Sequence, residues 1–162
     1  MLYVICGLPG TGKTIVSKRL SKMTGAVVLR TDEIRKRLYP DPRYTRDEKG
    51  KVYLAMMRTA ESMLKTGASV ILDATFHKKG RRNAAQRLAK RTEHGLMVIE
   101  VVCARALVEG RLARRKKGFS DAGVAVYRKI RAEWEPIKEG HLVVDTGKRG
   151  WEQELRAGLG LR

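Results

Sequence analysis

Eight residues near the start of the chain, GLPGTGKT at positions 7–14, restrict the fold more than any other stretch. They fit the pattern Gly-x-x-x-x-Gly-Lys-Thr and follow an apolar run from Leu2 to Cys6. Glycines in such a loop permit a tight turn whose backbone N–H groups point at phosphate oxygens, and the next helix directs its positive N-terminus at the same anion. The stretch therefore predicts a phosphate-binding loop between a buried strand and a helix.

We expect a nucleotide to contact every residue of this loop: Gly7, Leu8, Pro9, Gly10, Thr11, Gly12, Lys13 and Thr14. Lys13 can reach the β- and γ-phosphates, and the Thr14 hydroxyl can bind Mg²⁺. An ordinary glycine-rich turn is the alternative, but the strand before the loop and the amphipathic pattern after it favour nucleotide binding. ATP or another nucleoside triphosphate, together with Mg²⁺, is the expected cofactor pair.

Apolar runs recur along the chain in a way that predicts a parallel sheet. Continuous runs of this length are typical of strands buried on both faces, and they occupy residues 2–6, 26–29, 69–72, 97–102 and 141–144. The segments between them have helical spacing. A chain of 162 residues is long enough for one domain and too short for two ordinary ones. We therefore expect a single α/β domain, residues 1–162, with a doubly wound, mostly parallel five-stranded sheet.

Apolar side chains at helical spacing mark three helix faces that we expect to pack on the core. They are Ile15, Val16, Leu20 and Met23; Val52, Met56, Ala60 and Met63; and Val124, Tyr127, Ile130 and Trp134. Residues 39–51 are expected to form the longest loop, and Trp151 begins an expected C-terminal helix.

The chain carries a large excess of positive charge. Lys plus Arg number 35 and Asp plus Glu 17, which gives a formal net charge of +18. Such a field usually serves an anionic partner such as nucleic acid, a membrane surface or a polyphosphate. No run approaches the roughly 20 apolar residues of a membrane helix, and Gly7 begins the loop where a signal peptide would be cleaved. We expect a cytoplasmic protein that does not insert into membranes, with Cys6 and Cys103 as buried free thiols.

Two carboxylates fall where strands are expected to end, at the edge of the sheet that collects ligands. Asp73 closes an apolar strand and is expected beside the metal, with a helix N-cap as the alternative. Asp32 is equally well explained as an N-cap or as the base that accepts a proton from an attacking hydroxyl. Arg35, one helical turn later, can bind a phosphate of the acceptor or the transferring group.

Two basic stretches complete the set of candidate residues. Residues 111–117 carry five positive charges, and we expect a lid over the donor phosphates at about residues 111–121, although a solvated helix face is the alternative. Residues 78–82 are a second basic stretch that follows Asp73 and could grip a polyanionic acceptor. Phe76 is either a stacking face for a base or part of the core.

Four features of the sequence occur in the order seen in phosphate-loop kinases. They are the loop at residues 7–14, the segment Thr31 to Arg35, the strand end Leu72 to Phe76 and the Arg111-x-x-x-Arg115 spacing. In this the chain resembles the polynucleotide 5′-hydroxyl kinase group of the AAA-type P-loop kinase superfamily and its small-molecule relatives, over about residues 1–136. One departure is that Ala74 separates Asp73 from Thr75, a form also found in relatives that phosphorylate small molecules.

The resemblance implies a role for each matching residue. Asp32, Lys13 and Arg115 would be catalytic, with Asp32 as the general base and Arg115 as the lid arginine. Arg111 would lie near the adenine and Asp73 in the outer shell of the metal. Arg35, Thr75 and Phe76 would contact the acceptor.

Three functions are consistent with these residues. The leading one is transfer of the γ-phosphate to the 5′-hydroxyl of DNA or RNA, which the charge of +18 favours. The second is a kinase of a small hydroxylated metabolite or antibiotic, whose basic surface is incidental or serves contacts in a homo-oligomer. The third is a nucleic-acid-binding ATPase without an acceptor.

Overall fold

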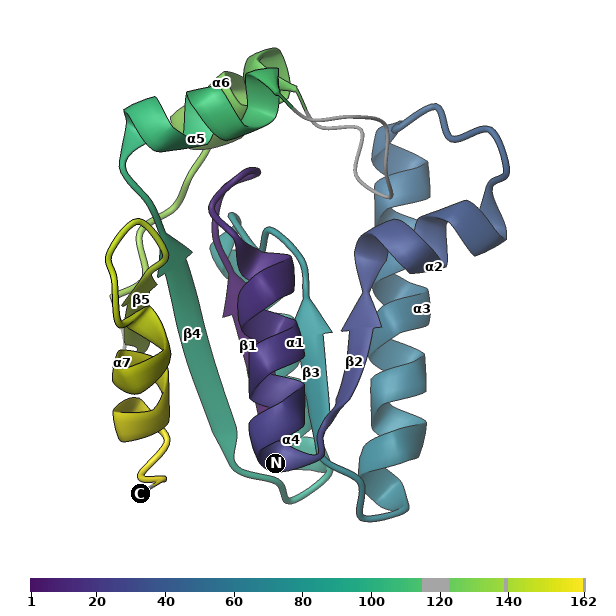
Figure 1. Ribbon diagram of the computed structural model, residues 1–162. Coiled ribbons are helices and arrows are strands. Elements are labelled where there is room, and N and C mark those ends of the chain that lie inside the picture. The colour runs from purple at the N-terminus through teal and green to yellow at the C-terminus, as the bar shows by residue number, and fades with distance from the viewer. Residues whose placement is uncertain (115–122, 139, 162) are drawn as a thin grey trace.

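A five-stranded, wholly parallel sheet runs through the centre of the molecule (Figure 1). The computed structural model describes residues 1–114, 123–138 and 140–161. The strand order is β2-β3-β1-β4-β5: the chain crosses from β1 to the edge strand β2, returns to β3 beside β1, and continues on the other side of β1 through β4 to β5. The strands are β1 (Leu2–Cys6), β2 (Val27–Arg30), β3 (Val70–Asp73), β4 (Leu96–Val102) and β5 (Leu142–Asp145).

Helices connect successive strands and supply the crossovers that a parallel sheet requires. They are α1 (Lys13–Thr24), α2 (Thr31–Leu38), α3 (Arg46–Lys65), α4 (Lys79–Arg91), α5 (Arg105–Ala113), α6 (Val124–Ala132) and α7 (Trp151–Gly158). No helix among the described residues is long and apolar enough to cross a bilayer.

The two faces of the sheet bury separate cores. α1 and α7 cover one face, where Val16, Leu20 and Leu155 pack on side chains of β1, β3, β4 and β5. α3 and α4 cover the other face, where Met56 and Leu88 belong to the second core. Because both faces are covered, β1 and β3 are buried along their whole length, which explains their unbroken apolar sequences.

α5 and α6 form a third layer across the carboxyl ends of the strands (Figure 1). Val108, Leu112 and Tyr127 make a small apolar cluster there, and Leu8 of the phosphate loop packs against it. This layer covers the edge of the sheet where ligands collect in parallel α/β folds.

The predicted α/β class and five-stranded parallel sheet are confirmed, and each strand lies within one residue of its expected bounds. Three local predictions are wrong. Ile15 is 61% exposed, because its position on α1 faces away from the sheet. Trp134 packs on the core but lies beyond the end of α6. The loop expected at 39–51 ends at Thr45, where α3 begins.

Cys6 and Cys103 are both free thiols. Cys6 is fully buried at the end of β1, and burial followed by the charge of Glu100 raises the pKa of its thiol to about 12. Cys103 is only partly buried.

Thr45 caps α3, and its contribution to stability can be measured. Its side-chain hydroxyl accepts a hydrogen bond from the Glu48 amide at 3.2 Å. We expect Thr45→Ala to lower the free energy of unfolding by about 1 kcal/mol in urea titrations, since that amide loses its partner. Thr59→Ala on the exposed face of the same helix is the matched control and should change stability by less than about 0.5 kcal/mol. Equal losses in the two variants would contradict the capping role.

Candidate active site

The phosphate loop leaves β1 and enters α1 through three glycines whose backbones only glycine adopts readily. Gly7, Gly10 and Gly12 have φ of +149°, +81° and +93°. A Cβ atom on Gly7 would overlap the carbonyl oxygen of Val101, and one on Gly10 would lie 2.9 Å from Leu112 Cγ. The loop is therefore held by neighbouring backbone and by α5 as well as by its own conformation.

Lys13 and Thr14 open α1 at the same edge. The Lys13 ammonium donates a hydrogen bond to the Leu8 carbonyl at 2.9 Å, across the mouth of the loop. The N-cap residue is Gly12, which has no side chain to satisfy the first amides of the helix. An anion in the loop can accept from these amides, as phosphates do at helix N-termini.

Asp73 lies at the end of β3 with 5% of its surface exposed. Ser17 on α1 donates a hydrogen bond to its carboxylate at 2.9 Å, and Arg30 Nε lies 3.3 Å from the same oxygen. Burial raises the pKa of Asp73, while Lys13, Ser17 and Arg30 oppose that rise. The alternative role of Asp73 as a helix N-cap is excluded, because α4 begins six residues later at Lys79.

Arg30, at the end of β2, connects Asp73 to the phosphate loop. Its guanidinium donates to the Thr14 hydroxyl at 2.9 Å and to Glu33 at 2.8 Å. The Arg30 guanidinium thus lies between the Thr14 hydroxyl, which was predicted to bind the metal, and the Asp73 carboxylate, which was predicted to lie beside it. Oxygen ligands of this kind suit Mg²⁺, so the residues present fit the expected ion.

The described residues contain no group of three or more His, Cys, Asp or Glu side chains that could hold a metal ion.

Asp32 lies in the first turn of α2 and is not its N-cap, which is Arg30. Arg35 donates to the Asp32 carboxylate at 3.2 Å, and its guanidinium lies 4.9 Å from the centre of the Tyr44 ring. The charge of Asp32 also contributes to the raised pKa of Asp73, after the larger effect of burial. The structure therefore brings Asp32, Arg35 and Asp73 to one edge of the sheet, next to Lys13.

The segment after β3 lines the other side of this edge. The Gly7 amide donates to the Thr75 carbonyl at 3.1 Å, so Thr75 anchors the start of the phosphate loop. The hydroxyl of Tyr53 on α3 also interacts with the Thr75 side chain. Burial raises the pKa of the Tyr53 hydroxyl, while Thr75, Arg81 and Arg35 oppose that rise.

The stacking role considered for Phe76 is wrong. The residue has a φ of +45°, and none of its surface is exposed. The ring packs edge-on against Tyr53, with centroids 5.4 Å apart. Phe76 is part of the core, as the alternative interpretation held.

Arg111 is brought to the phosphate loop through Thr146, which follows β5. The Arg111 guanidinium donates to the Thr146 hydroxyl at 3.0 Å, and that hydroxyl donates to the Thr11 carbonyl at 2.6 Å. The predicted lid arginine, Arg115, lies outside the described residues, as does most of the predicted lid at 111–121.

The basic stretch at residues 78–82 is not uniformly available to a ligand. Arg82 is buried and donates to the carbonyl oxygens of Phe76, Glu135 and Pro136, so its role is structural. The Arg81 guanidinium lies over the Tyr53 ring, 4.3 Å from its centre, and remains partly exposed.

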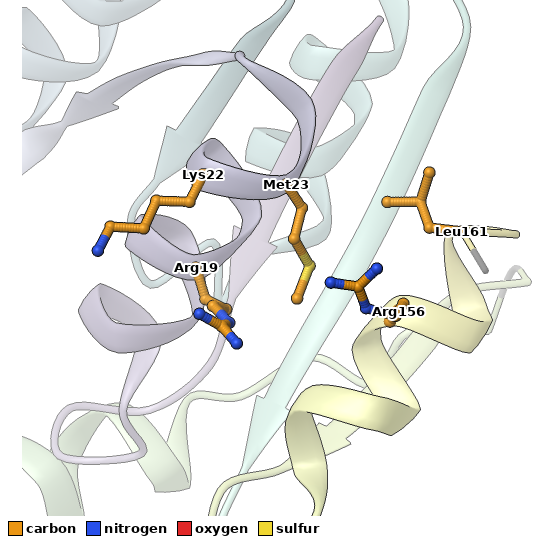
Figure 2. A pocket seen from close by; sticks show the side chains of 5 residues that line it. All are labelled: Arg19, Lys22, Met23, Arg156 and Leu161. Atoms are coloured by element: carbon orange, nitrogen blue, oxygen red, sulfur yellow. The ribbon is translucent and has the colours of Figure 1, made fainter.

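A hollow of about 580 Å³ adjoins Arg81 between the first turns of α3 and α4. It is lined by Arg46, Asp47, Gly50, Lys51, Leu54 and Arg81. Figure 2 shows a second hollow, of about 320 Å³, lined by Arg19, Lys22, Met23, Arg156 and Leu161. That hollow lies at the far end of α1 from the phosphate loop, and Glu152 neutralises Arg19 at 2.5 Å, so we do not assign it to the active site.

Comparison with known proteins identifies the class to which the chain belongs. The family described as an AAA domain (AAA_33) matches residues 2–137, and the chain is a member of this family. Protein Rv2004c of Mycobacterium tuberculosis, uncharacterized, is 29% identical over 160 residues. The match covers 91% of this chain and 32% of Rv2004c, so the chain spans about a third of the length of the curated relatives it matches.

Solved structures establish the fold as that of P-loop kinases. Kti12 of Chaetomium thermophilum, in complex with ADP-AlF3, superposes with a TM-score of 0.77 at 16% identity, covering 99% of this chain and 97% of Kti12. The APS kinase CysC of M. tuberculosis, in complex with AMPPNP and APS, gives a TM-score of 0.70 at 16% identity, covering 98% and 95% of the two chains. These likenesses show that the chain has the P-loop kinase fold.

Sequence reasoning missed Ser17, Arg30 and Thr146. Arg30 ends β2 and Thr146 directly follows β5, so their place at the carboxyl end of a strand was a usable signal. Ser17 lies one turn after Thr14 on α1, which puts both on the same helix face. Tyr53 gave no signal, since its place beside Thr75 depends on how α3 packs.

The cost of a side chain at Gly7 can be separated from the cost of its backbone conformation. We expect Gly7→Ala to lower the free energy of unfolding by about 3 kcal/mol or more, because strain and overlap with Val101 add together. Gly25→Ala is the control: φ is +71°, but a Cβ atom there has no neighbour within 4 Å. It should cost only about 1 kcal/mol in the same urea titration. A Gly7 variant no less stable than the Gly25 variant would show that the loop is not held by its surroundings.

Proposed function

We propose that this protein transfers the γ-phosphate of ATP, with Mg²⁺, to the 5′-hydroxyl end of DNA or RNA. The observation that carries the proposal is the Asp32 and Arg35 pair on α2, next to Asp73 and the phosphate loop. A carboxylate base and an arginine on one helix turn can hold the hydroxyl and a phosphate of the same acceptor.

Each residue has a defined task in this reaction. The phosphate loop and Lys13 bind the β- and γ-phosphates, with Thr14 and Asp73 on the side of the metal. Mg²⁺, when bound, neutralises charge on those phosphates. Asp32 accepts the proton of the acceptor hydroxyl as its oxygen attacks the γ-phosphorus, and ADP leaves. Arg35 positions Asp32 and binds the acceptor phosphate, while Arg111 lies on the donor side, where the family resemblance would also assign Arg115.

The charge distribution supports a polynucleotide acceptor. The hollow lined by Arg46, Lys51 and Arg81 lies beside Tyr53, whose hydroxyl is under the influence of both Arg81 and Arg35. Lys51 is paired with Asp47 at 2.8 Å, so the positive groups that lead away from Asp32 are Arg35, Arg81 and Arg46. A strand that neutralises several of them gains affinity from released counterions.

A small hydroxylated metabolite is the second candidate acceptor. It is supported by the APS kinase, a protein of the same fold whose structure holds APS. Such an enzyme gains no affinity from the basic groups near Arg81, so its acceptor should be insensitive to oligonucleotide. A nucleic-acid-binding ATPase without an acceptor is a third, weaker candidate, since Asp32 and Arg35 would then have no task.

Phosphate transfer from γ-labelled ATP to short 5′-hydroxyl DNA and RNA strands tests the proposal. We expect label on 5′-hydroxyl strands but not on 5′-phosphorylated ones, and a loss of at least about 100-fold in kcat for Asp32→Asn. Binding of ATP should be nearly unchanged, because Asp32 acts on the acceptor. Asp41→Asn, on the exposed loop before α3, is the matched control and should transfer normally.

Two results would overturn parts of this scheme. Bound ATP with no label on any strand would remove the polynucleotide acceptor and favour the small metabolite, to be sought by a metabolite screen. Near-normal transfer by Asp32→Asn would show that another group is the base.

Salt dependence tests the basic run separately from chemistry. Fluorescence anisotropy should show that affinity for a single strand falls steeply with salt, and that Arg81→Gln lowers the slope of log K against log salt by about 0.7. Arg91→Gln, at the other end of α4 and paired with Glu61, should leave the slope unchanged. A flat salt response in the wild-type protein would exclude this run as a nucleic-acid contact.

A further inference from the structure

Arg30 has no task in the scheme above, yet it contacts side chains of the candidate site on three elements. Its guanidinium reaches three elements: the Thr14 hydroxyl on α1 at 2.9 Å, Asp73 on β3 at 3.3 Å and Glu33 on α2 at 2.8 Å. Its side chain is only 13% exposed. A buried arginine with partners on three elements is placed by the tertiary structure and not by its own helix or strand.

Two of these partners are the oxygens that were assigned to the metal on independent grounds. Thr14 closes the phosphate-loop motif, and Asp73 is the carboxylate at the end of the neighbouring strand. The guanidinium occupies the space between them and supplies positive charge to both. A divalent cation near the same two oxygens would meet a like charge within a few ångströms, so the two cations compete for one position.

The three contacts of Arg30 are unequal. Nε lies near Asp73 but is not aligned for a hydrogen bond, so this contact is an ion pair alone. The contact with Glu33 is a short charge-assisted hydrogen bond. Glu33 lies on α2, three residues after Arg30, and accepts from Nη1, whereas Thr14 accepts from Nη2. It can therefore keep the guanidinium when the contacts with Thr14 and Asp73 are broken.

We propose that Arg30 is a resident cation that occupies the metal position of the nucleotide-free enzyme and withdraws onto Glu33 when the metal and nucleotide bind. In the free enzyme it balances the buried Asp73 carboxylate, which would otherwise be left with Lys13 as its nearby cation. It also keeps the Thr14 hydroxyl from binding a metal ion that arrives without nucleotide. Arg30 is thus a positioning residue that makes metal binding depend on nucleotide.

Mn²⁺ binding to the nucleotide-free protein, measured by electron paramagnetic resonance of the free ion at pH 8, tests this assignment. We expect Arg30→Gln to bind Mn²⁺ at least about tenfold more tightly than the wild-type protein, since the competing cation is gone. Arg37→Gln, an exposed arginine on the same helix as Glu33, removes one charge without touching the site and should change the affinity by less than about twofold. Equal affinities for the Arg30 variant and the wild-type protein would overturn the proposal.

Glu33→Gln provides a second test of the proposal, which does not require the Arg30 variant to be stable. Without Glu33 the guanidinium has only Thr14 and Asp73 as partners, so the variant should bind Mn²⁺ with ATP several-fold more weakly than the wild-type protein. In the double variant Arg30→Gln/Glu33→Gln this loss should disappear, because Glu33 acts through Arg30. A loss that persists unchanged in the double variant would show that Glu33 acts on the metal by its charge alone, which contradicts the proposed withdrawal.

The inference rests only on the part of the proposed function that concerns nucleotide and metal, and not on the acceptor. If Mn²⁺ with ATP binds to none of the proteins, the proposed phosphotransferase function fails together with this one. If it binds to all of them with the same affinity, only the role of Arg30 fails.

Discussion

A carboxylate buried at the end of β3 is the constraint on which the rest of the site depends. Asp73 is nearly inaccessible to water, so its charge must be met by protein groups, and these come from separate elements. Ser17 and Lys13 come from α1 and Arg30 from β2. Satisfying one side chain therefore fixes α1 against β3 and brings the end of β2 to the phosphate loop.

Much of this architecture was predictable because it follows from local pattern. Strands buried on both faces have unbroken apolar sequences, and the glycines of residues 7–14 leave few alternatives to a phosphate loop. The sequence also contains Thr45-x-x-Glu48, a capping pattern that marks the start of α3. The prolines before it favoured the prediction of a longer loop.

The features that were not predicted depend on contacts between distant residues. Phe76 lies in the core because the chain turns through a positive φ there, which sequence pattern does not reveal for an aromatic residue. Arg82 belonged to a basic run, and only the folded chain shows that it binds three carbonyl oxygens. Likewise, the partners of Arg30 come from three elements that meet only after the sheet has formed.

The carbonyl contacts of Arg82 also restrict how the layer over the strand ends can be displaced. Arg82 and the Lys79 amide fasten residues 135 and 136, just after α6, to the start of α4. At its other end the layer continues directly from β4 through α5. Arg111 bonds Thr146, and Leu8 packs against Val108 and Leu112, so α5 is also held to the phosphate loop. A displacement of α5 should therefore be transmitted to the phosphate loop, where a Cβ atom on Gly10 would lie only 2.9 Å from Leu112 Cγ.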